Sequence, residues 1–263
     1  MSFEKIFTNP EEDMDFMPII PLNETDQDNT NIEVPAEIPL LPLRNTVLFP
    51  GVVLPITVGR DKSIKAVNDA YKADKLIGVI AQKDSAIEDP ELKDLESIGT
   101  IARIIKLIKM PDGGTTIIIQ GKLRFIIDSI VTEEPYFKAK ITKLEEDQEV
   151  PDADFAAYVA NIKDLATDIV QLSPNIPSEA SIILRNIENP SFLIHFVSSN
   201  LNTELKEKQK LLELNKIRER ADLLMQLLQK ELQFAELKNK VTTKTRTEID
   251  KQQREYFLQQ QLK

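Results

Sequence analysis

The side chains that could support catalysis or metal binding are few in this sequence. His195 is the single histidine among 263 residues, and there is no cysteine. A zinc site built on imidazole or thiolate ligands is therefore not expected, nor is a triad with a histidine base. His195 stands between Ile194 and Phe196, so we expect a packed or edge histidine rather than a catalytic base.

Two further pairs of side chains have the right chemistry but the wrong surroundings. Lys62 and Ser63 could form a nucleophilic Ser–Lys pair, but no motif surrounds them, and we expect surface residues. Asp152 and Asp154 could bind a cation, but they lack the histidine or glycine context of such sites and read as a charged linker. The phosphate-binding pattern GxxxxGK[ST] is absent from the sequence. The chain is therefore expected to have no catalytic, metal or cofactor residues, and to act by binding.

Composition and charge limit the compartment and the partners. A hydrophobic fraction of 41% is enough for a core, and the absence of cysteine fits a reducing, cytoplasmic compartment. The sequence has no apolar run long enough for a membrane helix, and no secretory signal. Residues 1–37 hold ten acids and one lysine, which leaves the rest of the chain near neutral. We therefore expect a disordered acidic arm over 1–37, and no nucleic-acid ligand. The stretch DMDFMPIIPL within this arm is a candidate docking motif.

Short strands with proline and glycine breaks dominate residues 38–146. The patterns predict a turn at Phe49-Pro50-Gly51, a helix over 61–73 with Asp61 as N-cap, and a turn or bulge at Gly121-Lys122. Pro111-Asp112-Gly113-Gly114 predicts a hairpin. The predicted strands are 38–43, 52–58, 76–81, 100–110, 115–120, 124–131 and 136–144. This number of short strands indicates a small closed or strongly curved sheet.

Helical spacing replaces the strand pattern after the acidic run at 145–154. Helices are predicted over 155–172, from Ser178 to about 189, and over 191–200, which gives a helical subdomain over 152–202. A long projecting helix follows over 203–240, with Thr203 as its cap. Threonines at 241–247 interrupt it, and a last helix begins near Thr247. The long helix has apolar residues at spacings of three and four, typical of a coiled-coil seam that joins copies of the chain. We place in this seam Leu211, Leu214, Leu228 and Leu232.

Two segments resemble a known family. PLRNTVLFPGVVLPITVGR, residues 42–60, is similar to the opening of the N-terminal domain of Lon proteases, which are ATP-dependent serine proteases. QREYFLQQQLK, residues 253–263, is similar to the segment that precedes the ATPase module there. The resemblance implies an α+β fold, with a PUA-like β pseudo-barrel over 38–146 followed by the helical part. It also implies that the sequence stops just before the ATPase module, to which 247–263 would lead.

The resemblance implies a role in recognising substrates and assembling the protease. Lon proteases degrade misfolded, damaged and regulatory proteins, and such regions bind unfolded polypeptide and pass it to the ATPase ring of a homohexamer. The whole protein would use ATP and Mg²⁺; the Ser–Lys protease and ATPase residues would lie outside this chain. Binding of unfolded chains needs exposed apolar side chains. Our candidates are Phe49, Val52 and Val53 in the opening turn, and Leu223, Met225 and Leu227 on the long helix.

Two alternatives remain open from the sequence. One is a stand-alone, non-enzymatic adaptor or scaffold with a Lon-type N-domain and a coiled coil; the segment 253–263 argues against it. The other is a PUA-like RNA binder, which should have a basic face; the near-neutral balance after residue 37 disfavours it.

Overall fold

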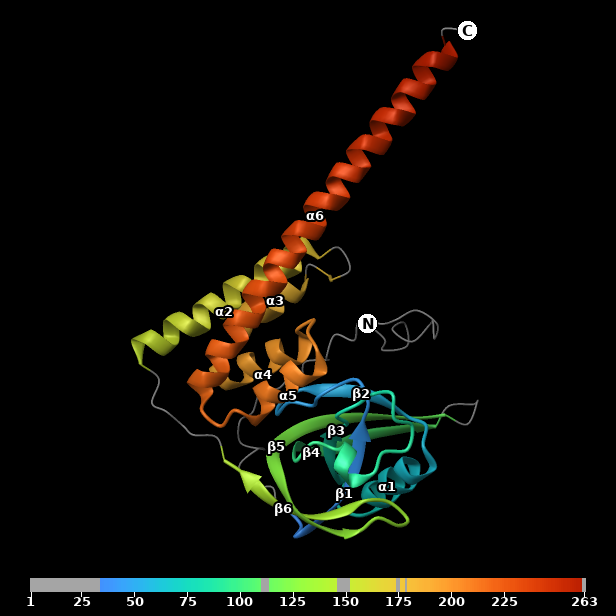
Figure 1. Ribbon diagram of the computed structural model, residues 1–263. Coiled ribbons are helices and arrows are strands. Elements are labelled where there is room, and N and C mark those ends of the chain that lie inside the picture. Colours follow the sequence, from blue (N-terminus) through green and yellow to red (C-terminus); the bar gives the residue numbers. More distant parts are fainter. Residues whose placement is uncertain (1–33, 110–113, 146–151, 174–175, 178, 262–263) are drawn as a thin grey trace.

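A closed β-sheet carries a layer of helices, from which one long helix projects (Figure 1). The computed structural model describes residues 34–109, 114–145, 152–173, 176–177 and 179–261. The acidic arm, except for its last residues, therefore lies outside the described residues. The strands are β1 (Glu37–Leu43), β2 (Val53–Val58), β3 (Leu76–Ala81), β4 (Ile98–Lys109), β5 (Thr115–Thr132) and β6 (Lys138–Leu144). The helices are α1 (Asp61–Lys72), α2 (Ala153–Leu172), α3 (Glu179–Asn186), α4 (Pro190–Asn200), α5 (Leu205–Glu213) and α6 (Ile217–Gln261), with a short 3-10 helix at Leu92–Asp94.

The six strands form one sheet that closes on itself. The strand order is β2-β5-β4-β3-β1-β6, and β6 also pairs with β5. Strand β5 can serve both neighbours because it is 18 residues long. Its first part pairs with β2 and its second part with β6. The predicted closed sheet, and with it the α+β fold class, is confirmed.

Gly121 marks the place where β5 changes partners. A β-bulge at this point shifts its register with β4. The predicted bulge is present, but the chain does not turn, so the two strands predicted over 115–120 and 124–131 are one strand. A Cβ atom on residue 121 would lie 2.2 Å from the carbonyl oxygen of Phe49, so only glycine fits there.

The starts of the helices differ in part from those that the sequence predicted. Helix α1 begins at Asp61, so its N-cap is Arg60, and the predicted Asp61 cap is wrong by one residue. The carboxylate of Asp152 accepts a hydrogen bond from the Phe155 amide at 2.8 Å and caps α2. Asp152 therefore caps helix α2, in addition to being one of the acidic residues of the predicted linker. The predicted Ser178 cap lies outside the described residues.

The predicted long helix over 203–240 is wrong at three points. A short helix, α5, ends at Glu213, and α6 begins only at Ile217. The N-cap of α5 is Glu204 rather than Thr203. Finally, α6 continues through 241–247, where an interruption and a restart at Thr247 were expected.

Two threonines of α6 have hydroxyl groups that form hydrogen bonds within the helix. Thr242 donates to the carbonyl oxygen of Lys238 at 2.9 Å, and Thr245 donates to that of Val241 at 3.0 Å. Threonine lowers helix propensity by only about 0.7 kcal/mol or less per residue. This penalty is too small to end a helix whose neighbours favour it.

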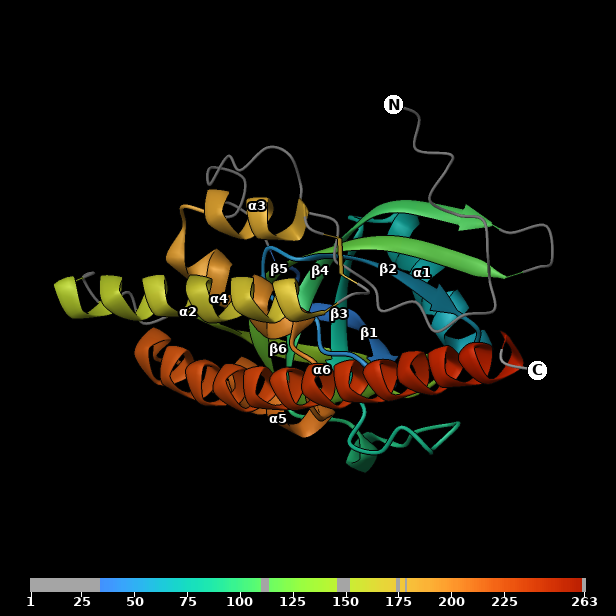
Figure 2. The same ribbon diagram turned by 90° about the horizontal axis from the view of Figure 1, so that it is seen from above.

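Two apolar clusters stabilise the fold. One fills the inside of the closed sheet and includes Ile38, Leu40, Ile80, Ile101 and Phe125. The other is shared by the outside of the sheet and by helices α2, α4, α5 and α6. Because the second cluster is continuous, the helical layer packs directly on the sheet. Viewed from above, α2 and the first part of α6 run side by side over it (Figure 2).

Candidate binding surface

The end of α5 is held by an arginine from the sheet. Arg124 of β5 is fully buried. Its guanidinium donates to the carbonyl oxygens of Leu212 (2.9 Å) and Leu214 (3.0 Å), and to the side-chain oxygen of Asn215 (2.8 Å). The last carbonyl groups of a helix have no partner within it and carry partial negative charge. Arg124 therefore fixes the end of α5 on the sheet.

A second buried arginine holds the same helix end from the other side. Arg220 of α6 donates from Nε to the carbonyl oxygen of Leu211 at 2.9 Å, and from Nη2 to that of Leu214. We call the connection 214–216, which lies between the two arginines, the α5–α6 corner. This corner sets the direction in which α6 leaves the body of the protein. The sequence analysis missed both arginines. Each is the single basic residue of a mostly apolar stretch, LRFII for Arg124 and RADLLM for Arg220, and this pattern could have revealed them.

His195 belongs to this junction. It is buried on α4, its ring centroid lies 5.9 Å from that of Phe49, and its Nε2 lies 3.3 Å from Nη1 of Arg220. A guanidinium can only donate, so Nε2 is the acceptor and the imidazole is neutral. The interpretation of His195 as a packed side chain is confirmed.

The predicted contact residues of the opening turn lie between the sheet and the helices. Phe49, Val52 and Val53 are all buried, at 5% exposure or less. Gly51 has φ +79°, as the turn prediction requires, and its amide donates to the carbonyl oxygen of Gly121 at 2.9 Å. These side chains join the two layers, and in this structure they offer almost no surface to a substrate.

The predicted contact residues of the long helix are also packed. Leu227 is buried, whereas Leu223 and Met225 are half-buried against the shared cluster. The amide nitrogen of Asn161 on α2 lies 3.5 Å from the sulfur of Met225. These three residues therefore pack the first part of α6 on its neighbours, with little area left for another chain.

The four predicted seam residues do not share one helix. Leu211 is buried on α5, and Leu214 lies in the α5–α6 corner. Leu228 and Leu232 belong to α6, where Leu228 is buried and Leu232 packs at the edge of the shared cluster. The prediction of one continuous seam is wrong because the corner separates the two pairs. A role of these leucines in assembly stays a prediction.

The accessible apolar surface lies farther out on α6. Phe234, Leu237 and Val241 are 64%, 59% and 58% exposed. Spacings of three and four place them along one side of the helix, in line with Leu223 and Leu227. We call these three residues the outer row. The sequence analysis missed it, although the 3-4 spacing that continues from Leu227 was a readable signal.

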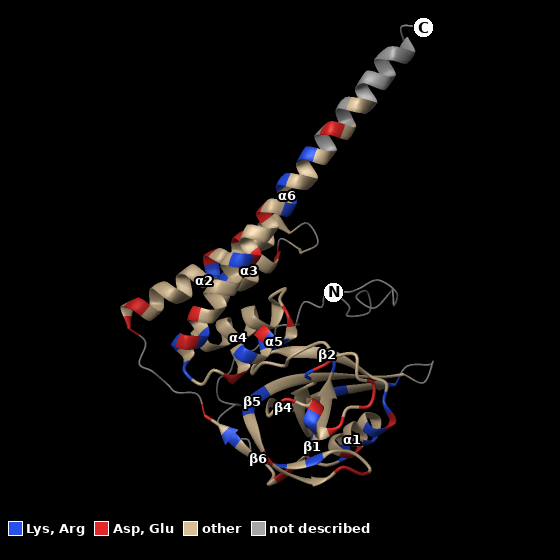
Figure 3. Ribbon diagram, in the orientation of Figure 1, with Lys and Arg blue, Asp and Glu red and all other residues tan. Residues whose placement is uncertain are grey.

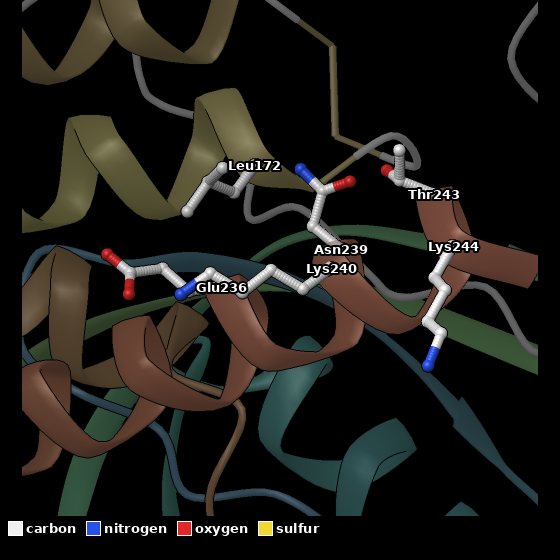
Figure 4. A pocket seen from close by; sticks show the side chains of 6 residues that line it. All are labelled: Leu172, Glu236, Asn239, Lys240, Thr243 and Lys244. Carbon is white, nitrogen blue, oxygen red and sulfur yellow. The ribbon is translucent and has the colours of Figure 1, made fainter. Parts of the chain in front are cut away.

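An open cleft lies on another side of the same part of α6, where α2 ends (Figure 4). Its volume is about 470 Å³, and it is bordered by Leu172 of α2 and by Glu236, Asn239, Lys240, Thr243 and Lys244 of α6. Asn239 and Thr243 point toward the end of α2, whereas Lys244 points away from it. The cleft shows that the end of α2 borders α6 as far as Lys244, on a side that does not include the outer row.

The Lys62–Ser63 pair is not arranged for nucleophilic catalysis. The Lys62 ammonium lies 2.8 Å from a carboxylate oxygen of Glu134, and this hydrogen bond raises the pKa of Lys62. A lysine that acts as a base needs the opposite shift. The Lys62 side chain lies at the surface as expected, but Ser63 is buried.

Metal and membrane sites were sought in the described part of the chain. Over these residues, no three His, Asp or Glu side chains come together as a metal site would require. No helix there is long and apolar enough to cross a membrane.

The fold defines a class: a closed β-sheet with a helical layer packed on it and one projecting helix. The chain belongs to the ATP-dependent protease La (LON) substrate-binding domain family, whose sequence model matches residues 37–230. It is 52% identical over 93% of its length to the Lon protease of Flavobacterium johnsoniae, and 41% identical over 94% to that of Porphyromonas gingivalis. It spans about 30% of the length of each of these relatives.

Solved structures show the same fold. The N-terminal domain of Lon protease from the Mycobacterium avium complex superposes with a TM-score of 0.60 at 22% identity, and covers 73% of this chain and 98% of its own. A Lon N-terminal domain protein from Xanthomonas campestris gives a TM-score of 0.52 at 15% identity, over 72% of this chain and 96% of its own. The predicted resemblance to the N-terminal region of Lon proteases is confirmed.

Proposed function

We propose that this chain is the substrate-recognition and assembly region of a cytoplasmic, ATP-dependent Lon-type serine protease. It binds unfolded or damaged polypeptide for protein quality control and passes it to the ATPase ring. The whole protein uses ATP and Mg²⁺ and assembles as a homohexamer. The family match supports the general role, and the lengths of the relatives support a longer parent protein.

The proposed recognition of unfolded polypeptide rests on one observation, the outer row on α6. Three large apolar side chains, each more than half exposed, lie within two turns of a helix that projects from the body. Unfolded proteins differ from folded ones by exposing apolar side chains, and exposed apolar surface at α6 would select for that difference. The core contacts of Phe49, Leu227 and their neighbours position this helix; the outer row makes the contact.

Fluorescence anisotropy tests this proposal. The chain is titrated, without nucleotide, into one labelled protein in a folded and in a permanently unfolded form. We expect binding of the unfolded form alone, and the triple variant Phe234→Ser, Leu237→Ser, Val241→Ser should weaken it at least about tenfold, since three buried apolar contacts are lost.

A matched control removes similar apolar area elsewhere. Ile105, Val131 and Ile182 are 50%, 43% and 61% exposed and lie on β4, β5 and α3. Their replacement by serine should leave the affinity within about twofold. If the two triple variants lost the same affinity for the unfolded protein, a specific role of α6 would be contradicted. If the chain bound neither labelled form, this region would be a scaffold rather than a recognition region.

A further inference from the structure

Basic side chains surround the outer row. No Asp or Glu occurs between Glu236 and Glu248, whereas Lys238, Lys240, Lys244 and Arg246 fall in this interval. The three lysines are exposed. Lys238 lies three or four residues from both Phe234 and Val241, and Lys240 lies three residues after Leu237, so lysines border the row on both sides. Figure 3 shows this basic stretch on the projecting part of α6. The surface is therefore both apolar and cationic.

The N-terminal arm has the complementary composition. Residues 11–22, EEDMDFMPIIPL, begin with four acids within five residues and continue with five apolar residues within seven. Apolar and acidic groups thus stand next to each other here, as apolar and basic groups do on α6. No Lys or Arg occurs between Lys5 and Arg44, so no basic residue within or directly after the segment offsets its acids.

The arm segment is long enough to cover the outer row. The outer row extends over eight residues of helix, or about 10 Å at 1.5 Å per residue. The apolar half of the arm segment, seven residues long, reaches about 20 Å when extended and can cover the row while the acids reach the lysines. The fourteen residues between the segment and β1 span up to about 48 Å. A flexible tether that spans two sites gives an effective concentration in the millimolar range.

We infer that residues 11–22 dock on the outer row and its lysines, and that the arm competes there with unfolded polypeptide. The inference rests on the proposed function for the identity of the competitor, but the docking itself does not. The arm is then a built-in regulator of access: a substrate binds only when its own apolar segments displace the arm.

Two titrations with the whole 263-residue chain test the inference. The triple arm variant Phe16→Ser, Ile19→Ser, Ile20→Ser should bind labelled unfolded protein about fivefold to tenfold more tightly, as expected if the arm occupies the row most of the time. A labelled peptide of residues 9–24 should bind this variant. It should bind more weakly as salt rises, and should not bind when Phe234, Leu237 and Val241 are also serine.

The control variant Phe3→Ser, Ile6→Ser removes apolar residues from the arm outside the docking segment, and should leave both affinities unchanged. The two proposals can fail separately. Peptide binding that depends on the outer row, without binding of unfolded protein, supports arm docking and contradicts the proposed function. Binding of unfolded protein that is unaffected by the arm variant or by added peptide overturns arm docking and leaves the function intact. Peptide binding that survives loss of the outer row also overturns it.

Discussion

The two halves of α6 have apolar residues at similar spacing, but these residues are buried in one half and exposed in the other. In the inner half, 217–232, Arg220, Ala221, Leu224 and Leu228 are almost completely buried by α2, α4 and α5. In the outer half, 233–261, Phe234, Leu237 and Val241 are mostly exposed. The end of α2 at Leu172 borders a different side of α6, which includes Asn239 and Thr243, and leaves the outer row exposed. An apolar row on a helix therefore indicates contact, but whether the contact lies within the chain depends on the neighbouring elements.

The largest effect that tests this comparison should come from Arg220 in the inner half. Replacing Arg220 with methionine keeps much of its volume but removes the donors to the carbonyl oxygens of Leu211 and Leu214. Buried groups left without partners destabilise a fold, so the free energy of unfolding should fall by about 3 kcal/mol. Urea denaturation followed by circular dichroism measures it.

Arg218 provides the matched control for that variant. It pairs with Asp152, and its side chain is 33% exposed. Arg218→Met should cost no more than about 1 kcal/mol, because ion pairs that water reaches contribute little. If the two methionine variants were equally stable, the corner would not be the feature that holds α6.

A smaller effect is expected at Glu231, near the boundary of the two halves. Burial raises the pKa of this carboxyl group, although its oxygen accepts a hydrogen bond from the Asn202 amide at 3.3 Å. Since the folded pKa lies above the unfolded one, the ionised group disfavours the fold at neutral pH. This penalty disappears as the pH falls through the raised pKa and the group is protonated.

Glu231→Gln should therefore increase the free energy of unfolding at pH 7, by less than about 0.5 kcal/mol. The difference from the parent chain should shrink toward pH 4, and urea titrations at several pH values measure both. A difference that grew on acidification would show that the ionised form is favoured by its surroundings.

The smallest effect on global unfolding should come from the outer half. Proline at position 241 removes a helical hydrogen bond and clashes with the preceding turn. Val241→Pro should lower the helical signal in circular dichroism but leave the urea midpoint unchanged, because the outer half has few contacts with the core. A midpoint shift as large as that of Arg220→Met would mean that the two halves unfold as one unit.

The sequence predicted the parts of the fold that depend on local chemistry. Gly51 has the positive φ that a Pro-Gly turn requires, and β1, β2 and β3 lie within a residue of their predicted bounds. Proline, glycine and alternation act over a few residues, so a pattern reveals them.

The errors have non-local causes. The sequence between Thr203 and Lys240 contains no local signal for a helix end. The break at 214–216 is instead stabilised by hydrogen bonds from Arg124, some 90 residues earlier in the chain, which a local pattern cannot reveal. The predicted stop at 241–247 failed because helix propensity is weak compared with the continuity of a long helix. The contact residues were misplaced for a similar reason: Phe49 and Leu227 have the right side chains, but their exposure depends on elements far away in the sequence.

The α5–α6 corner also makes α6 a lever. Helix α6 has 45 residues, so it is about 67 Å long at 1.5 Å per residue. The outer half alone extends about 42 Å beyond the last packed turn. A rotation of about 10° at the corner would move its far end by about 12 Å, roughly two full helical turns. Small changes in how two arginines hold one helix end would thus be amplified into displacements at the far end that are larger than a side chain.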